Sequence, residues 1–170
     1  MNLKWIGAIC IVVAASGFGM MLALYHKKEV KTLKNLITAL DFMECELQFR
    51  MCALPELCRR TAAESDGVVQ NVFLALSNEL EDQISPDVRK CMYSAIGKVK
   101  DIPEQTGQCL ELLGDSLGRF DLEGQLKSLE NVRRECRVRL NKLNEKSDKH
   151  LRSYETLGIC AGAALVIILM

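Results

Sequence analysis

Residues 113–125 read LGDSLGRFDLEGQ, and the chain continues without proline or glycine from residue 125 to residue 157. Gly118 suits the left-handed residue that commonly follows the end of a helix. Asp121 suits the N-cap of the next helix, because its carboxylate can accept a hydrogen bond from a free backbone N–H group. The stretch therefore predicts a tight turn between two antiparallel helices, the second of which can run unbroken toward the C-terminus.

Upstream of this turn, apolar residues recur at steps of three and four, the spacing of amphipathic helices. Pro55 and Pro103 fit the first positions of helices, Ser85 before Pro86 fits a helix start, and Asp66-Gly67 marks a break. No stretch alternates with period two, and aromatic residues make up only 5% of the chain, which argues against strands. The prediction is an all-α fold, a bundle of about six helices on N- and C-terminal membrane helices. The expected core positions are Leu33, Leu36, Ile37, Leu40, Met43, Leu47, Val68, Val72, Leu76, Leu80, Val88, Met92, Ala95, Ile96, Leu110, Leu113, Leu117, Leu122, Leu126, Leu129, Cys136, Leu140, Leu143 and Leu151.

Both ends of the chain are apolar. Residues 5–25 (WIGAICIVVAASGFGMMLALY) carry no charge, and about 20 apolar residues are enough to cross a bilayer. A cleaved signal peptide is the alternative, because Lys4 precedes the run and small residues lie within it. The continuation through MMLALY into a group of lysines favours an anchor. Residues 156–170 (TLGICAGAALVIILM) form a shorter run, about 22 Å long as a helix, which leaves open whether it crosses the whole bilayer. Within it, Gly158 and Gly162 have the GxxxG spacing that allows close helix packing.

The charges that flank these runs predict their orientation. Four lysines follow the first run and eight basic residues precede the second, whereas only Lys4 lies outside them. The positive-inside rule then places the region between the runs in the cytoplasm. The predicted organisation is an N-terminal tail (1–4), a transmembrane helix (5–25), a cytoplasmic helical bundle (26–155) and a short C-terminal transmembrane helix (156–170).

The net charge conceals a pattern along the chain. With 22 basic and 22 acidic residues the formal total is zero, so there is no overall attraction to nucleic acid. Residues 1–34 hold five basic residues and one acidic residue, residues 131–170 hold eight and four, and residues 35–130 hold nine and seventeen. The distribution predicts a basic collar at the membrane and an acidic distal head that can meet a basic partner.

Eight cysteines raise the question of a zinc site or of disulfides. No two of them have CxxC spacing, and the only histidines, His26 and His150, flank the apolar ends, which argues against zinc. Cys45 and Cys52 are seven residues apart, which predicts two small buried residues on one helical face. We therefore expect free thiols in a reducing cytosol and no metal ligand.

The signature motifs of nucleotide sites, zinc proteases and calcium loops are missing from the sequence. Residues 114–117 spell GDSL, the nucleophile block of a family of esterases, so an esterase that uses Ser116 is one alternative function. Here the tetrapeptide lies in helical periodicity and lacks a positioned histidine base, which leaves the serine a weak nucleophile. A second alternative is a helical module that binds anionic lipid through the basic residues between 133 and 152. The preferred expectation is that the chain is not an enzyme and has no catalytic residue and no cofactor.

The segment 113–125, together with the charged helix after it and the terminal YETLGICAGAALVIILM, resembles the stage III sporulation protein AB family of endospore-forming bacteria. The likeness covers nearly the whole chain, because an N-terminal anchor and a leucine-rich helix leading to LPEL (residues 54–57) precede the core in the family's order. The core and the terminal run together are specific. Phe120 stands where the family usually has a small polar residue, which alters the packing expected in that turn.

The resemblance implies a non-enzymatic component of the sporulation channel complex in the membrane between mother cell and forespore. The expected location is the mother-cell side of the outer forespore membrane, with the central domain cytoplasmic. The cytoplasmic part resembles the helical domains of the inner-membrane platform protein of type II secretion and type IV pilus systems, which contact a hexameric ATPase. The implied partners are the sporulation ATPase (stage III protein AA) and other stage III A membrane proteins, with self-association left open.

The residues of the family motif are expected to serve either the helix turn or a partner contact. Close packing, helix termination, capping and a polar position one turn into the next helix would account for them structurally. We call this set the turn motif: Gly114, Leu117, Gly118, Asp121 and Gln125.

Overall fold

A computed structural model of the chain describes the backbone of residues 2–50, 52–82, 87–118 and 121–169, and the side chains of residues 21, 24–50, 52–82, 87–118 and 121–145. The described residues form helices and turns and contain no strand, which confirms the all-α prediction. The helices are α1 (Asn2–Arg50), α2 (Leu54–Ala63), α3 (Gly67–Glu81), α4 (Val88–Lys98), α5 (Glu104–Ser116) and α6 (Leu122–Leu169).

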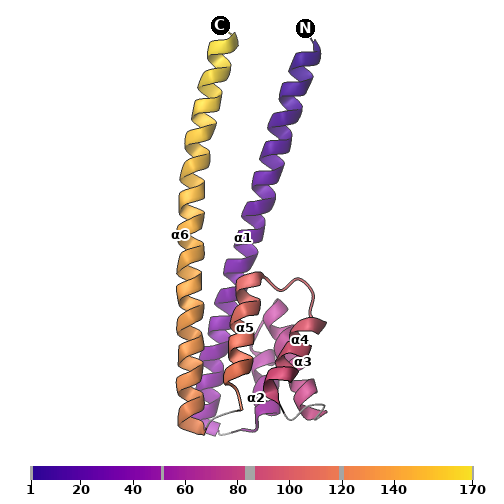
Figure 1. The fold of residues 1–170 in the computed structure, drawn as a ribbon, viewed down its shortest axis with the longest axis vertical. Helices are drawn as coiled ribbons and strands as arrows, with labels where there is room; N and C mark the ends of the chain where they lie inside the picture. The colour runs from indigo at the N-terminus through magenta and orange to yellow at the C-terminus, as the bar shows by residue number, and fades with distance from the viewer. Residues whose placement is uncertain (1, 51, 83–86, 119–120, 170) are drawn as a thin grey trace.

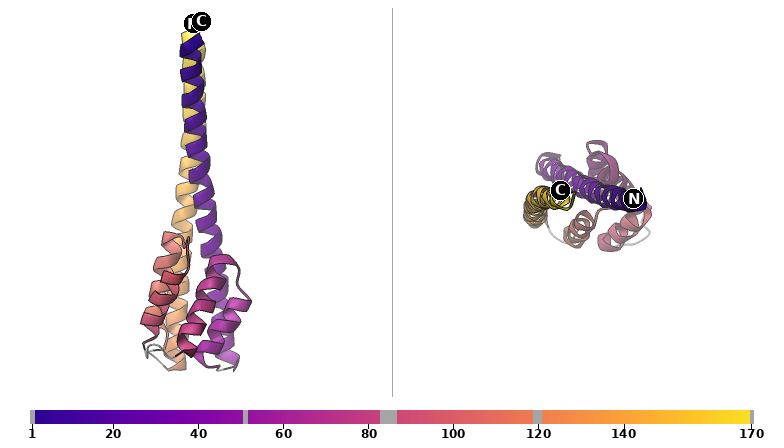
Figure 2. Two further views of the ribbon diagram at one scale, coloured as in Figure 1. Left: turned by 90° about the vertical axis from the view of Figure 1, so that its right-hand side faces the viewer. Right: turned by 90° about the horizontal axis from the view of Figure 1, so that it is seen from above.

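Two long antiparallel helices, α1 and α6, form a hairpin that carries the four short helices at one end (Figure 1). The two ends of the chain lie at the other end of the hairpin, where α1 and α6 diverge (Figures 1 and 2). We call α2–α5, with the segments of α1 and α6 that they cover, the head. Consecutive helices run up and down, so the C-terminal ends of α1, α3 and α5 lie at the distal end of the head, far from the termini (Figure 1).

The core forms where α1 passes through the head. α1 contacts α2, α3, α5 and α6, and its predicted apolar stripe is buried, with Leu33, Leu36 and Met43 fully inaccessible. Ile37, at the margin of this stripe, is half-buried. On α3 the buried set also includes Val69 and Phe73, because that helix is covered by α1, α2 and α4 and so buries more than the one predicted stripe.

The helix boundaries follow the local signals closely. Gly67 begins α3 with φ +61, and Pro55 takes the second position of α2 rather than the first. Asp87 caps α4, its carboxylate accepting a hydrogen bond from the Arg89 backbone N–H at 3.1 Å. The predicted start at Ser85 lies outside the described residues. Pro103 occupies the N-cap position of α5 and has no side-chain acceptor to offer there.

The long helices are continuous, as predicted: α1 runs for 49 residues and α6 for 48. The predicted membrane runs fall within them. The side chains of the run 156–170, Gly158 and Gly162 included, and most of those of the run 5–25 lie outside the described residues. In the part that is described, no helix has a stretch both long enough and apolar enough to cross a membrane.

Candidate functional site: the two ends of the head

The turn motif lies at the distal end, where it connects α5 to α6. Gly118 has φ +74, and a Cβ atom placed on it would lie 2.7 Å from Cγ2 of Val88. Asp121 accepts hydrogen bonds as predicted, from the Gly124 backbone N–H to its carboxylate at 3.1 Å and from the Gln125 N–H to its carbonyl at 2.8 Å. The motif therefore ends one helix, starts the next and sets the distance to α4.

Gly114 brings α5 against α4. A Cβ atom on Gly114 would stand 2.7 Å from Cβ of Met92, so only glycine allows this approach of the two helices. On the outer edge of the same contact, Arg89 forms an ion pair with Asp115 at 2.8 Å and lies 5.7 Å from the ring centre of Tyr93. Hydrogen bonding to Tyr93 and the charge of Asp115 raise the pKa of Arg89.

Ser116, the candidate nucleophile, is in the last turn of α5 and donates a hydrogen bond to the Leu112 carbonyl at 2.9 Å. This is the back-bond of an ordinary helical serine, and the GDSL tetrapeptide forms helix and helix end rather than a strand-to-helix elbow. His150 lies outside the described side chains. Among the described residues, no three histidine, cysteine or acidic side chains come together in a way that could hold a metal ion.

The described cysteines are free thiols, and four of them, Cys58, Cys91, Cys109 and Cys136, are buried in the core. Burial, with a smaller effect of Cys52, raises the pKa of Cys58 to about 12, so it acts as a small apolar residue. Hydrogen bonding to Cys109 and burial raise the pKa of the Cys136 thiol, which joins α5 to α6. The prediction for the pair at 45 and 52 was wrong: Cys45 is exposed and Cys52 lies beyond the end of α1.

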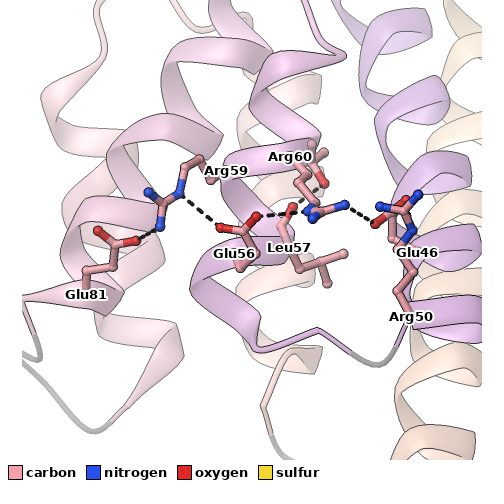
Figure 3. Close-up of polar contacts among 8 residues, drawn as sticks. Glu46, Arg50, Glu56, Leu57, Arg59, Arg60 and Glu81 are labelled. Carbon is pink, nitrogen blue, oxygen red and sulfur yellow. Dashed lines mark hydrogen bonds and ion pairs between the residues drawn. The ribbon is translucent and has the colours of Figure 1, made fainter.

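A line of alternating charges crosses α1, α2 and α3 near the distal end (Figure 3). Arg59 bridges Glu81 and Glu56, the second at 3.3 Å, and Arg60 bridges Glu56 at 2.9 Å and Glu46 at 3.3 Å. Arg50 completes the line at 3.6 Å from Glu46. The six charges cancel, so this surface offers no net charge to a partner.

Beside this line, Phe49 is a large apolar side chain that remains uncovered among the described residues of the distal end. It is 80% exposed. It lies one residue before the end of α1, within one helical turn of the ion-paired Glu46. Around the same end, Asp82, Asp121 and Glu123 are exposed carboxylates. We call Phe49 and these three acids the distal surface.

The opposite, proximal end of the head is held by polar contacts from the hairpin helices. Glu29 of α1 is only 5% exposed, and its carboxylate accepts a hydrogen bond from the Gln105 backbone N–H at 3.1 Å. It thus supplies the N-terminal cap of α5 that Pro103 cannot supply. From α6, Arg139 donates to the Gln105 side chain at 3.0 Å and also to that of Gln108.

A second contact between the hairpin helices is formed by Arg133, which pairs with Asp41 at 2.7 Å and with Glu44 at 2.6 Å. The hydrogen bond with Asp41 is the main reason that the pKa of Arg133 is raised. Arg133 and Arg139 belong to the basic stretch that the sequence assigned to the collar. Both are instead engaged within the head, so the free positive charge of that stretch is smaller than its composition indicates.

These observations define the class: an all-α head on a long antiparallel helix pair, in which the turn motif and several charged side chains join helix to helix. The chain belongs to the stage III sporulation protein AB family, whose family model matches residues 4–170. It is 25% identical over 171 residues to the stage III sporulation protein AB of Bacillus subtilis (strain 168), covering 99% of both chains. A solved structure titled stage III sporulation protein AB (SpoIIIAB) has the same fold, with a TM-score of 0.60 and 16% identity over 72% of this chain and 98% of that one.

The comparisons confirm the family resemblance and the fold, and the family is a sporulation family rather than a known enzyme family. What sequence reasoning missed is the proximal end. Pro103 at a helix start was a signal that α5 needs a cap from elsewhere, but nothing in the sequence pointed to Glu29, which is 76 positions away from Gln105.

Proposed function

We propose that the protein is a non-enzymatic scaffold component of the sporulation channel complex, anchored in the membrane between mother cell and forespore and docking a cytoplasmic ATPase through its head. The observation that carries the proposal is the separation of the two ends of the molecule: both chain termini lie at one end of the hairpin and the distal surface lies at the other (Figure 1). An anchored protein of this shape holds a binding surface clear of the bilayer.

The membrane part of the proposal is supported by the two apolar runs, 5–25 and 156–170, each of which is continuous with a helix of the hairpin. Because both termini are at one end of the hairpin, both runs lie on the same side of the head. A reporter enzyme fused to the C-terminus and active only outside the cytoplasm is the expected result. Activity of the fusion only in the cytoplasm would contradict the proposed topology.

The partner part of the proposal commits to Phe49 as the central contact of the distal surface. Exposed aromatic residues that become buried in an interface are frequent hot spots, and the three exposed acids at the same end of the head favour a partner with basic side chains. By analogy with secretion platforms, this partner is the sporulation ATPase, stage III protein AA, within an assembly that includes the other stage III A membrane proteins.

The test is capture of the purified ATPase by the detergent-solubilised full chain. Phe49→Ser is expected to weaken binding by about 30-fold, the size of a hot-spot truncation. Leu74→Ser is the matched control, because Leu74 is also exposed, at 46%, but lies on α3 at the side of the head. Equal loss in both variants would show that the distal surface is not the docking site, and no capture by the unaltered chain would remove the ATPase from the proposal.

A further inference from the structure

Three large apolar side chains are exposed together where α1 leaves the head. Met21 is 73% exposed, Leu24 59% and Tyr25 51%. The other exposed large apolar residues of the described surface, such as Leu74 and Val138, lie singly on different helices. Scattered apolar residues are normal on a protein surface, whereas a group of three within five positions indicates a surface that is covered by something else.

Directly beyond this group, α1 carries an uncompensated row of lysines. Lys27, Lys28, Lys31 and Lys34 are all exposed, and none of them forms an ion pair within the described part of the chain. The acid within this segment of α1, Glu29, is buried and turned toward α5. The exposed face of this segment therefore carries positive charge alone.

Two arginines of the basic stretch on α6 differ from these lysines. Arg133 pairs with two carboxylates of α1, and Arg139 pairs with Glu135 at 3.0 Å and with two glutamine side chains. These two arginines are therefore engaged within the head, whereas the four lysines of α1 are not paired with any described acid.

The register of the hairpin places the apolar group at a boundary. The ion pairs of Arg133 with Asp41 and Glu44 place these residues of α1 and α6 at the same level. Each residue toward the N-terminus of α1 then corresponds to one residue toward the C-terminus of α6, so Tyr25 is level with residues 149–152. Met21 is level with residues 153–156, where the C-terminal apolar run begins. On one side of this level both helices are apolar, and on the other side both are charged, which is the position of a membrane–water interface.

We infer that the face of α1 formed by Leu24, Lys27, Lys28 and Lys31 binds anionic phospholipid headgroups at the cytoplasmic surface of the membrane, with Met21 and Tyr25 in the interfacial layer. The inference rests on the proposed membrane anchoring and adds the lipid class. Lys27 and Lys28 lie about 3 to 5 Å beyond Tyr25 along the helix axis and Lys34 about 14 Å beyond it. Since the Debye length is about 8 Å at physiological salt, the first two lysines dominate and Lys34 contributes little.

The experiment measures which lipid surrounds residue 24 in the full chain. Trp5, the only tryptophan in the sequence, is replaced by phenylalanine and Leu24→Trp provides the probe. The protein is reconstituted into vesicles that contain brominated phosphatidylcholine or brominated phosphatidylglycerol, and quenching of Trp fluorescence gives the relative affinity of the two lipids for this site. We expect phosphatidylglycerol to be preferred by about fivefold or more, because each lysine near an anionic surface contributes roughly that factor.

Variants then assign the preference to residues. K27Q/K28Q is expected to bring the ratio of the two affinities close to one, and K34Q to change it by less than about twofold, since Lys34 lies beyond the Debye length. K90Q is the matched control, because Lys90 is an exposed lysine at the start of α4, at the far end of the head. A ratio near one in the parent, or a ratio that K27Q/K28Q leaves unchanged, overturns the inference.

The two proposals fail in different ways. Equal quenching by both brominated lipids shows that the hairpin is in the bilayer but has no lipid preference, so only the inference fails. Absence of quenching by either lipid shows that residue 24 is not at the membrane, and then the proposed anchoring fails with it.

Discussion

The two ends of the head are held together by different kinds of contact. At the distal end, Gly114 and Gly118 let helices approach so closely that a single methyl group would collide, and Asp121 caps the helix that it precedes. At the proximal end, Glu29 and Arg139 reach across from the hairpin helices to α5. The α5–α6 turn at the distal end depends on shape and on local chain geometry, with the ion pairs of Arg59, Arg60 and Arg89 beside it. The proximal end depends on polar contacts between distant segments. Substitutions at the two ends should therefore change the free energy of unfolding by different amounts, and different second substitutions should restore it.

The largest effect is expected for Gly118→Ala. The new Cβ atom would sit 2.7 Å from Val88 Cγ2, in a residue with φ +74, and the backbone strain and overpacking together should cost about 2 to 4 kcal/mol. The measurement is the free energy of urea unfolding of the full chain in detergent. When Gly118→Ala is combined with Val88→Ala, the part of the lost stability that comes from the collision should be recovered. The part that comes from the positive φ should remain.

The matched control for this substitution is Gly97→Ala in α4. A Cβ atom on Gly97 would meet nothing within 4 Å, so alanine should stabilise the helix by about 0.5 kcal/mol. If Gly97→Ala and Gly118→Ala destabilise the chain equally, close packing is not what holds the distal end.

A smaller loss is expected at the proximal end for Glu29→Ala. Removing the carboxylate leaves the Gln105 N–H without its partner in a partly buried position, which should cost about 1 to 3 kcal/mol. Glu29→Gln keeps an acceptor oxygen and should cost less than Glu29→Ala. Glu130→Ala, at an exposed position of α6, should change the free energy of unfolding by no more than about 0.5 kcal/mol. An effect of Glu29→Ala as small as that of the control would mean that α5 needs no cap from α1.

The contrast between the ends also explains what could be predicted from the sequence. Asp121 and the N–H group it caps are three positions apart, and Gly118 carries its conformational preference in its own chemistry, so the turn could be predicted from thirteen consecutive residues. The apolar spacing of α1 likewise predicted a buried face, because one helix determines its own periodicity. The contact between Glu29 and Gln105 depends on the packing of α1 against α5, and no local pattern encodes it. Cys45 shows the same limit, since helical spacing alone does not say which face meets the core.

A still smaller loss of unfolding free energy is expected for Arg133→Met. This substitution tests whether polar contacts between the hairpin helices stabilise the protein away from the proximal end. Arg133 is 22% exposed and its two partners are 44% and 27% exposed, so solvent screens the pairs and the loss should be about 1 kcal/mol. Arg137→Met is the control, because Arg137 is exposed on the same helix. If urea unfolding gives the same free energy for both variants, the ion pairs of Arg133 contribute nothing beyond a surface charge.

The last prediction uses pH to separate a polar contact from a packing contact inside the head. The hydrogen bond from Lys98, and then that from Ser94, lowers the pKa of Glu79, which joins α3 to α4. Because the folded state binds the proton less readily than the unfolded state, the contribution of Glu79 is complete above the ordinary value of 4.5 and is lost as the pH falls through the lowered pKa. The difference in unfolding free energy between the parent and Glu79→Gln should therefore be constant near neutral pH and shrink on acidification, and Lys98→Gln should remove most of that pH dependence. Gly118→Ala should show no such change, because a steric collision does not titrate. A difference for Glu79→Gln that stays constant down to pH 3 would mean that the ion pair of Glu79 with Lys98 adds nothing to the packing of α3 against α4.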